Sequence, residues 1–208
     1  MIRRRRQLIA LAACGAGAIA LATAVSASAW ATDDRVELAT VVASWPAAYE
    51  ATGMKSEPLY TEHIAVSRDD DTFRVRIEVL GQGDAALGTQ DSTVRVADDG
   101  TVSWVSGCTK TPALCADDTQ LRGFLATAAL VGLDRQGRLP ATGTARDLHG
   151  TAVVCVADAD LHPDAAPATV RLDPCFDRAT GAVVGHYSPG SDAFVGATLA
   201  PGFTVTGP

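Results

Sequence analysis

The sequence predicts an α+β fold built around one curved antiparallel sheet. Three observations lead to this prediction. Residues 72–80 alternate between apolar and polar side chains, which is typical of a strand with one buried and one solvated face. The Asp-Asp-Gly step at residues 98–100 separates two β-branched runs and is typical of a tight hairpin, because glycine accepts a positive φ. Apolar residues at helical spacing over 35–51 and 119–133 add a helix before the strands and a helical insertion between them.

The first 31 residues have the composition of an export signal. Four arginines at residues 3–6 precede an uncharged stretch from residue 8 to residue 31 that is rich in Ala, Leu, Ile and Gly. Residues 27–29 and 29–31 both match the A-x-A pattern that signal peptidase cleaves. We therefore expect a signal peptide over residues 1–31 and an exported α+β domain over residues 32–208.

Two alternatives for the leader remain open. Its apolar stretch is long enough to span a membrane, in which case it would stay as an anchor with the arginines on the cytoplasmic side. Residues 11–14 resemble a lipobox, whose Cys14 would carry a lipid. Residues 5–9 resemble a twin-arginine signal, beside the ordinary Sec route. Each route places the domain outside the cytoplasm, secreted or attached to the cell envelope, with membrane contact only through an uncleaved leader.

The composition is that of one acidic globular domain. The chain of 208 residues has a formal net charge of −7 and 47% hydrophobic residues. This apolar content is enough to bury one core. Cleavage of the leader removes four arginines and makes the exported part more acidic still. Because a field of this sign repels phosphate backbones, we exclude nucleic acid as a partner.

The elements of the exported domain are predicted in order from periodicity and turn residues. The helix over 35–51 contains Pro46, which can break it. A strand over 59–67 and a charged turn over 69–71 lead into the alternating strand 72–80. After a loop over 81–88, strands 92–97 and 101–105 flank the hairpin turn. The helix over 119–133 begins after Asp117 or Asp118, either of which can cap it. A linker over 134–144 precedes strands 151–157, 168–173, 182–187 and 194–205.

The four cysteines that follow the leader predict two disulfides. They are Cys108, Cys115, Cys155 and Cys175, an even set that allows three connectivities. We favour a local bridge between Cys108 and Cys115, which are close in sequence and joined by a loop. If strands 151–157 and 168–173 pair about a turn centred near residue 165, Cys155 lies opposite Cys175. This symmetry favours Cys155–Cys175 as the second bridge.

No residue pattern identifies a reaction. The four histidines are dispersed, and no spacing of His, Cys, Asp or Glu matches a metal site. The sequence lacks the G-x-S-x-G and S-x-x-K motifs of serine nucleophiles. We therefore expect no catalytic residue, no metal and no cofactor.

Three local patterns point to a family. They are Phe73-Arg74-Val75-Arg76-Ile77, the hairpin DDGTVSW at residues 98–104, and the segments HGTAVVC at 149–155 and FDRATGAV at 176–183. Together they resemble the bacterial LolA/LppX/RseB-like group of envelope proteins. The resemblance implies a half-open β-barrel whose concave face is covered by an N-terminal helix and a helical insertion. It also implies binding of lipids, acylated proteins or a signalling partner.

Two functions follow from these expectations. The first is a non-enzymatic exported envelope protein that holds an apolar ligand, a lipid or acyl chain, in the concavity of the sheet. The candidate lining residues are Phe73, Val75, Ile77, Val79, Trp104 and Phe124. The alternative is an envelope sensor or interaction domain with a fully packed interior, which binds another envelope protein through loops or a sheet edge. In that case the same residues form ordinary core.

Overall fold

The computed structural model describes residues 34–107, 123–162 and 172–195, and the backbone of 204–206. These residues belong to one compact unit, Asp33–Pro208. The expected leader with Cys14, the cysteines Cys108 and Cys115, and residues 119–122 of the expected helical insertion lie outside the described residues. The signal peptide, its alternatives and the local bridge therefore stay predictions.

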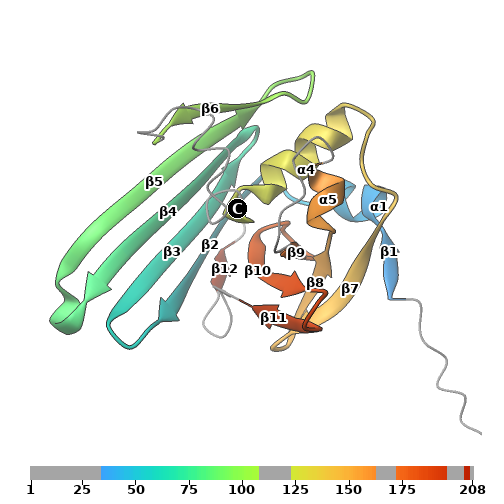
Figure 1. Cartoon of the computed structure of the whole chain (residues 1–208). Helices are drawn as coiled ribbons and strands as arrows, with labels where there is room; N and C mark the ends of the chain where they lie inside the picture. Colours follow the sequence, from blue (N-terminus) through green and yellow to red (C-terminus); the bar gives the residue numbers. More distant parts are fainter. Residues whose placement is uncertain (1–33, 108–122, 163–171, 196–203, 207–208) are drawn as a thin grey trace, which may run out of the picture. The chain divides into compact units, whose positions relative to one another are not determined.

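The strands form two antiparallel sheets (Figure 1). The long sheet has the strand order β12-β2-β3-β4-β5-β6, and the short sheet has the order β1-β7-β8-β9-β10-β11. The bounds are β1 Arg35–Glu37, β2 Ala48–Ser56, β3 Tyr60–Asp69, β4 Thr72–Gly81, β5 Ala86–Val96, β6 Val102–Ser106, β7 Thr142–Leu148, β8 Thr151–Cys155, β9 Asp173–Asp177, β10 Val183–Ser188, β11 Ala193–Val195 and β12 Thr204–Thr206. The predicted α+β class with antiparallel strands is confirmed, and the predicted single sheet is wrong.

The first two strands of the chain belong to different sheets, β1 to the short sheet and β2 to the long sheet. β1 pairs with β7, where Val36 lies opposite Gly143. Helix α1 (Leu38–Ala43) and Pro46 then redirect the chain into β2, which starts the long sheet. The expected helix over 35–51 is therefore shorter than predicted. Tyr49 and Ala51 are buried at alternate positions of β2, a period-two pattern that the sequence interpretation assigned to a helix.

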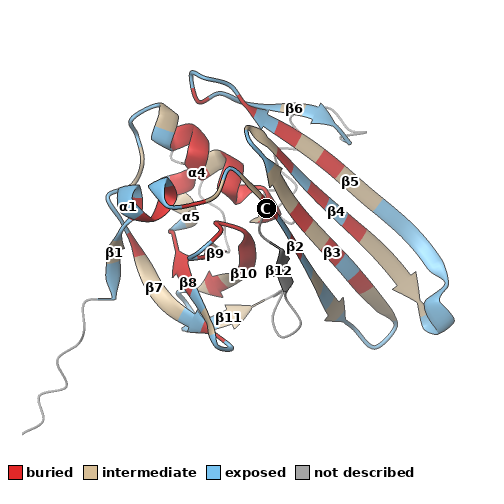
Figure 2. Ribbon diagram, turned by 180° about the vertical axis from the view of Figure 1, so that it is seen from behind, coloured by how far each residue is buried: buried red, intermediate tan, exposed pale blue. Residues whose placement is uncertain are grey.

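The long sheet is built from successive hairpins. β2 to β6 pair in chain order, and short turns join most of them. A 3-10 turn, η1 (Gln82–Asp84), lies between β4 and β5, so the predicted loop over 81–88 is shorter than expected. Phe73, Val75 and Ile77 are buried, whereas Arg74 and Arg76 are exposed (Figure 2). The predicted alternation of strand 72–80 is confirmed.

The predicted hairpin at residues 98–100 joins β5 to β6 and docks onto helix α4 (Ala126–Arg135). Gly100 has φ +79°, and the backbone N–H of Thr101 donates to the Asp99 carboxylate over 2.9 Å. Gly100 and Gly132 of α4 touch: a Cβ at Gly100 would lie 2.3 Å from the Gly132 carbonyl oxygen. The guanidinium of Arg135 donates to the Val96 carbonyl oxygen over 2.9 Å and pairs with Asp71. These contacts fix one end of the long sheet to the helix.

The short sheet contains the predicted disulfide. Val153, Val154 and Cys155 of β8 lie opposite Asp177, Phe176 and Cys175 of β9. This is the predicted register, and Cys155 and Cys175 are bonded. β9 begins later than the predicted strand 168–173, whose first four residues are not among those described. β7 occupies part of the predicted linker over 134–144. Helix α5 (Asp158–Leu161) follows β8.

Two apolar clusters stabilise the unit. The main core combines the inner face of the long sheet, α1, α4 and one face of the short sheet; its members include Val66, Val75, Leu38, Leu130, Val154, Phe176 and Val183. A second cluster lies on the opposite face of the short sheet and consists of Leu148, Val153, Cys155, Cys175, Val184 and Tyr187, with Phe194 packed against it. The short sheet is therefore covered by apolar contacts on both faces.

Candidate functional site

Of the six residues expected to line a cavity, four belong to the main core and two pack against it. Phe73, Val75, Ile77 and Phe124 are at most 3% exposed, and Val79 and Trp104 are partly buried against the same cluster. The structure therefore brings the predicted set together. None of the six is among the lining residues of two pockets found within the described segments, one on the short sheet and one on the long sheet.

Two polar side chains interrupt the inner face of the long sheet. Glu62 lies opposite Lys55 in the sheet register, and Ser92 lies opposite Val75. Both side chains are buried, and within the described residues Oε2 of Glu62 and Oγ of Ser92 have no hydrogen-bond partner. Such groups cost free energy when they are desolvated without a partner. The apolar alternation of strand 72–80 (β4) does not predict these two buried polar residues, because they lie on other strands. Glu62 lies on β3 and Ser92 on β5, which flank β4.

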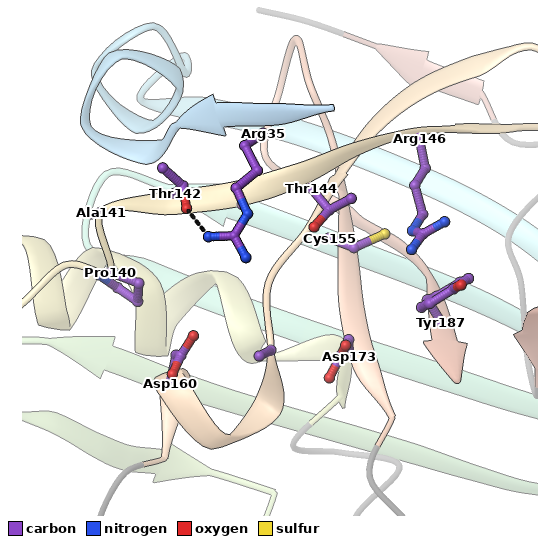
Figure 3. A pocket seen from close by; sticks show the side chains of 12 residues that line it. Arg35, Pro140, Ala141, Thr142, Thr144, Arg146, Cys155, Asp160, Asp173 and Tyr187 are labelled. Atoms are coloured by element: carbon purple, nitrogen blue, oxygen red, sulfur yellow. Dashed lines mark hydrogen bonds between the residues drawn. The ribbon is translucent and has the colours of Figure 1, made fainter. Parts of the chain in front are cut away.

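A pocket lies on the outer face of the short sheet, the face that carries the second cluster. We call it the short-sheet pocket. Its volume is about 210 Å³. Its lining comprises Arg35, Pro140, Ala141, Thr142, Gly143, Thr144, Arg146, Cys155, Ala157, Asp160, Asp173 and Tyr187 (Figure 3). Among these are two arginines, two aspartates and one half of the disulfide.

The strand register explains why these side chains meet. Thr142, Thr144 and Arg146 occupy alternate positions of β7 and therefore point to the same face. Arg35 of β1 lies opposite Thr144 on one side, and Cys155 of β8 lies opposite it on the other. Three neighbouring strands thus contribute to one row of side chains. The disulfide at the end of the row joins β8 to β9 and holds this part of the wall together.

The two arginines form the cationic side of the short-sheet pocket. Arg35 donates to the Thr142 hydroxyl over 3.4 Å. The guanidinium carbon of Arg146 lies 3.5 Å from the ring centroid of Tyr187, a cation–π contact that fixes its position. The Nε of Arg146 is buried and has no hydrogen-bond partner in the structure. No ion pair of the described residues joins either arginine to a carboxylate.

Asp160 of α5 and Asp173 of β9 form the anionic side. In Figure 3 both carboxylates lie across the pocket from the Arg35 guanidinium. The Asp173 carboxylate accepts a hydrogen bond of 3.0 Å from the backbone N–H of Asp158. Partial burial raises the pKa of Asp173 above its usual value, and the negative charges of Asp158 and Asp160 act in the same direction.

The Tyr187 ring forms one wall and is itself held in place. Its hydroxyl donates to the Asp192 carboxylate, and this hydrogen bond raises the pKa of Tyr187. Its ring also packs edge-on against Phe194, with 5.7 Å between ring centroids. These two contacts hold the ring on the side where Arg146 stacks.

His186 lies next to Tyr187 in the chain but is directed toward the main core. Its ring meets Phe124 in a T-shaped contact with 6.0 Å between ring centroids. Burial lowers the pKa of His186 to about 4, and the opposing effect of Asp158 is smaller. His186 is therefore neutral near neutral pH.

The sequence interpretation missed the short-sheet pocket. The first three residues of its main strand, β7, were predicted as part of the linker over 134–144, and the rest of β7 was not assigned to a strand; Thr142, Thr144 and Arg146 alternate with small residues instead of large apolar ones. The period of two was present and is the signal that could have identified the strand. The long-range pairing of Arg35 with Thr144 has no local signal in the sequence.

Among the residues that the structure describes, no group of three or more His, Cys, Asp or Glu side chains is arranged to hold a metal ion. No helix among the described segments is long and apolar enough to cross a membrane.

Comparisons with known proteins find no matching family model, no matching curated protein and no matching solved structure.

Proposed function

We propose that this chain is a non-enzymatic binding domain of an oxidising, extracytoplasmic compartment, with a packed interior and a ligand site in the short-sheet pocket. This is the packed-interior alternative expected from the sequence, with recognition in a pocket instead of at a sheet edge. The observation that carries the proposal is the pocket's set of positioned charges. Two arginines and two aspartates line one cavity, and no ion pair between them is present.

The packing of the long sheet supports the same proposal. Phe73, Val75 and Ile77 are in contact with the side chains of the protein's own core. Residues that face their own helix in this way do not need a bound lipid to cover them. The short-sheet pocket, in contrast, is bordered by charged side chains of both signs that form no ion pair with one another, which is the composition of a recognition site.

The Cys155–Cys175 disulfide supports the compartment. Structural disulfides form and persist in oxidising surroundings, such as the space outside the cytoplasm. The expected leader agrees with this assignment and is a separate prediction from the sequence.

A carrier of lipid or acyl chains is the second candidate. It would use a half-open barrel formed by the long sheet, as the resemblance to the LolA/LppX/RseB-like group implies. Incomplete burial of Val79 and Trp104 favours it. The exposed side chains of Leu59 and Leu87, 72% and 64% accessible, also favour it, since both lie at the end of the sheet where β2 meets β3 and β4 meets β5.

Mapping of bound small molecules by NMR separates the two candidates. The isotopically labelled full-length chain would be titrated with a set of small polar fragments and, in parallel, with a fatty acid. We expect the fragments to shift the amide signals of Thr142, Thr144 and Tyr187 and to leave those of Val75 and Ile77 unchanged. Saturable shifts of Val75 and Ile77 with the fatty acid, with no response at the pocket, would replace the proposal by the carrier.

A further inference from the structure

We propose that the short-sheet pocket binds a small zwitterion with one carboxylate and one ammonium group, in the size class of a free amino acid. This inference rests on the proposed function, because it names the ligand class of the same pocket. It starts from one observation: charges of both signs line the cavity, with the guanidinium groups and the carboxylates on different elements.

The cationic side has the geometry to hold a carboxylate. Arg35 lies opposite Thr144, and Arg146 is two residues further along the same strand. Such diagonal neighbours in an antiparallel sheet have Cα atoms roughly 7–8 Å apart, which two arginine side chains easily span. Each guanidinium offers paired N–H donors that match the two oxygens of a carboxylate. The hydroxyls of Thr142 and Thr144 lie in the same wall.

Arg146 is held in place on this side of the pocket without forming an ion pair among the described residues. Its guanidinium is held over Tyr187, and its buried Nε has no acceptor in the structure. A buried donor without a partner costs free energy, and more so on a charged group. A carboxylate between Arg35 and Arg146 would accept hydrogen bonds from guanidinium N–H groups that face the pocket and would neutralise both charges in part.

The anionic side has the geometry to hold an ammonium group. Asp173 is half-buried and lies near two further carboxylates, those of Asp158 and Asp160. Three negative charges that repel one another are stabilised by a cation among them. Asp158 already has a neighbouring partner in His162, at 4.0 Å. Asp160 and Asp173 line the cavity itself.

The balance of charge selects a zwitterion over a simple ion. The lining carries two guanidinium groups and two carboxylates. A plain anion placed at the arginines would be repelled by Asp160 and Asp173, and a plain cation would be repelled by the arginines. A neutral ligand with both charges meets an opposite charge at each end. The Pro140 and Tyr187 side chains leave an apolar surface for the rest of the molecule.

Calorimetric titration of the full-length chain with its disulfide intact tests this inference. The probes are the common free amino acids, acetate as the carboxylate half, methylammonium as the ammonium half, and glycerophosphoethanolamine as the zwitterionic part of a lipid headgroup. We expect saturable binding of at least one amino acid near neutral pH, with Kd at least tenfold lower than for either half. Stronger binding of glycerophosphoethanolamine than of every amino acid would overturn the carboxylate assignment.

Substitutions locate the binding. Arg146→Lys keeps the charge but loses the forked donors and should raise the Kd about tenfold. Asp160→Asn, which keeps the size and removes the charge, should act similarly on the ammonium end. Arg76→Gln, on the outer face of the long sheet, is the matched control and should leave the Kd unchanged. If Arg146→Lys reduces the thermal stability, Arg35→Gln is used in its place. Arg35 is exposed, and its substitution should also raise the Kd.

The outcomes separate this inference from the proposed function. If polar fragments shift the pocket amides but no amino acid binds, or acetate binds as tightly as every amino acid, the zwitterion assignment is wrong and the pocket still binds ligands. If neither fragments nor amino acids perturb the pocket, both proposals fall. If an amino acid binds and the Arg76→Gln control weakens it as much as Arg146→Lys does, the site is elsewhere.

Discussion

The two sheets of this protein have the same antiparallel pairing but differ in how many of their faces are buried. In the long sheet, Val75 and Ile77 face the core while Arg74 and Arg76 face solvent. In the short sheet, successive residues of one strand pack on opposite sides: Phe176 joins the main core and Cys175 joins the second cluster. An antiparallel strand therefore shows the period of two in its sequence only where one of its faces meets water.

This difference also separates the ways in which the sheets are stabilised. The inner face of the long sheet packs against a large common core. The outer face of the short sheet has only a small cluster, and the Cys155–Cys175 bridge lies within it. Covalent closure compensates for limited apolar burial in small structures. The next three predictions test this contrast, from the largest expected effect to the smallest.

The largest effect is expected on the long sheet, from Ile77→Asp compared with Glu78→Lys. Ile77 is 3% exposed, so an unpaired carboxylate there should lower the free energy of unfolding by several kcal/mol. Glu78 is on the opposite face, and its change should cost within about 0.5 kcal/mol. Urea unfolding of both variants measures the difference. Equal losses would mean that the two faces are not distinct.

An intermediate effect is expected on the short sheet when its disulfide is removed. The bridge closes a loop with a sequence separation of 20 residues. Replacing both cysteines by alanine should lower the free energy of unfolding by about 3 kcal/mol, because the unfolded chain gains conformational freedom. Hydrogen exchange should then accelerate at Val153 and Val154 more than at Val66 and Val75. Uniform acceleration in both sheets would show that they open as one cooperative unit.

The smallest of the three effects is a pH dependence from His186. The unfolded chain protonates this side chain near its ordinary pKa of 6.5, whereas the folded chain holds the pKa at about 4. The unfolded state therefore binds more protons between these values, so the free energy of unfolding falls as the pH drops from about 6.5 toward 4. The ring of His186 is not completely buried, so solvent screens part of the effect that the full pKa shift would have. The expected loss in the free energy of unfolding is about 2 kcal/mol.

Comparison with His186→Asn isolates this contribution from that of the carboxylates. The variant should lose less stability than the parent chain over the same pH range. The exposed His63, on the outer face of the long sheet, provides the matched variant His63→Asn, which controls for the loss of one histidine from the surface. If the His186→Asn curve runs parallel to that of the parent, burial does not keep this histidine neutral.

The contrast between the sheets also explains which parts of the fold the sequence predicts. The hairpins of the long sheet follow from local signals: the alternation around Val75 and the turn at Gly100. The register of Cys155 and Cys175 follows from symmetry about the intervening turn. The pairing of β1 with β7 could not be predicted in the same way, because Arg35 and Thr144 are far apart in sequence. The candidate pocket depends on that pairing and was missed for the same reason.

The glycine contact between the hairpin turn and α4 limits how this sequence can diverge. A Cβ at Gly132 would lie 2.6 Å from the Gly100 carbonyl oxygen, and a Cβ at Gly100 would be closer still to the backbone of Gly132. Neither residue can acquire a side chain unless the turn and the helix move apart. Descendants of a common ancestor are expected to retain both glycines or to lose both together with the docked turn. This pair is therefore a marker by which a remote homologue could be recognised after its surface residues have changed.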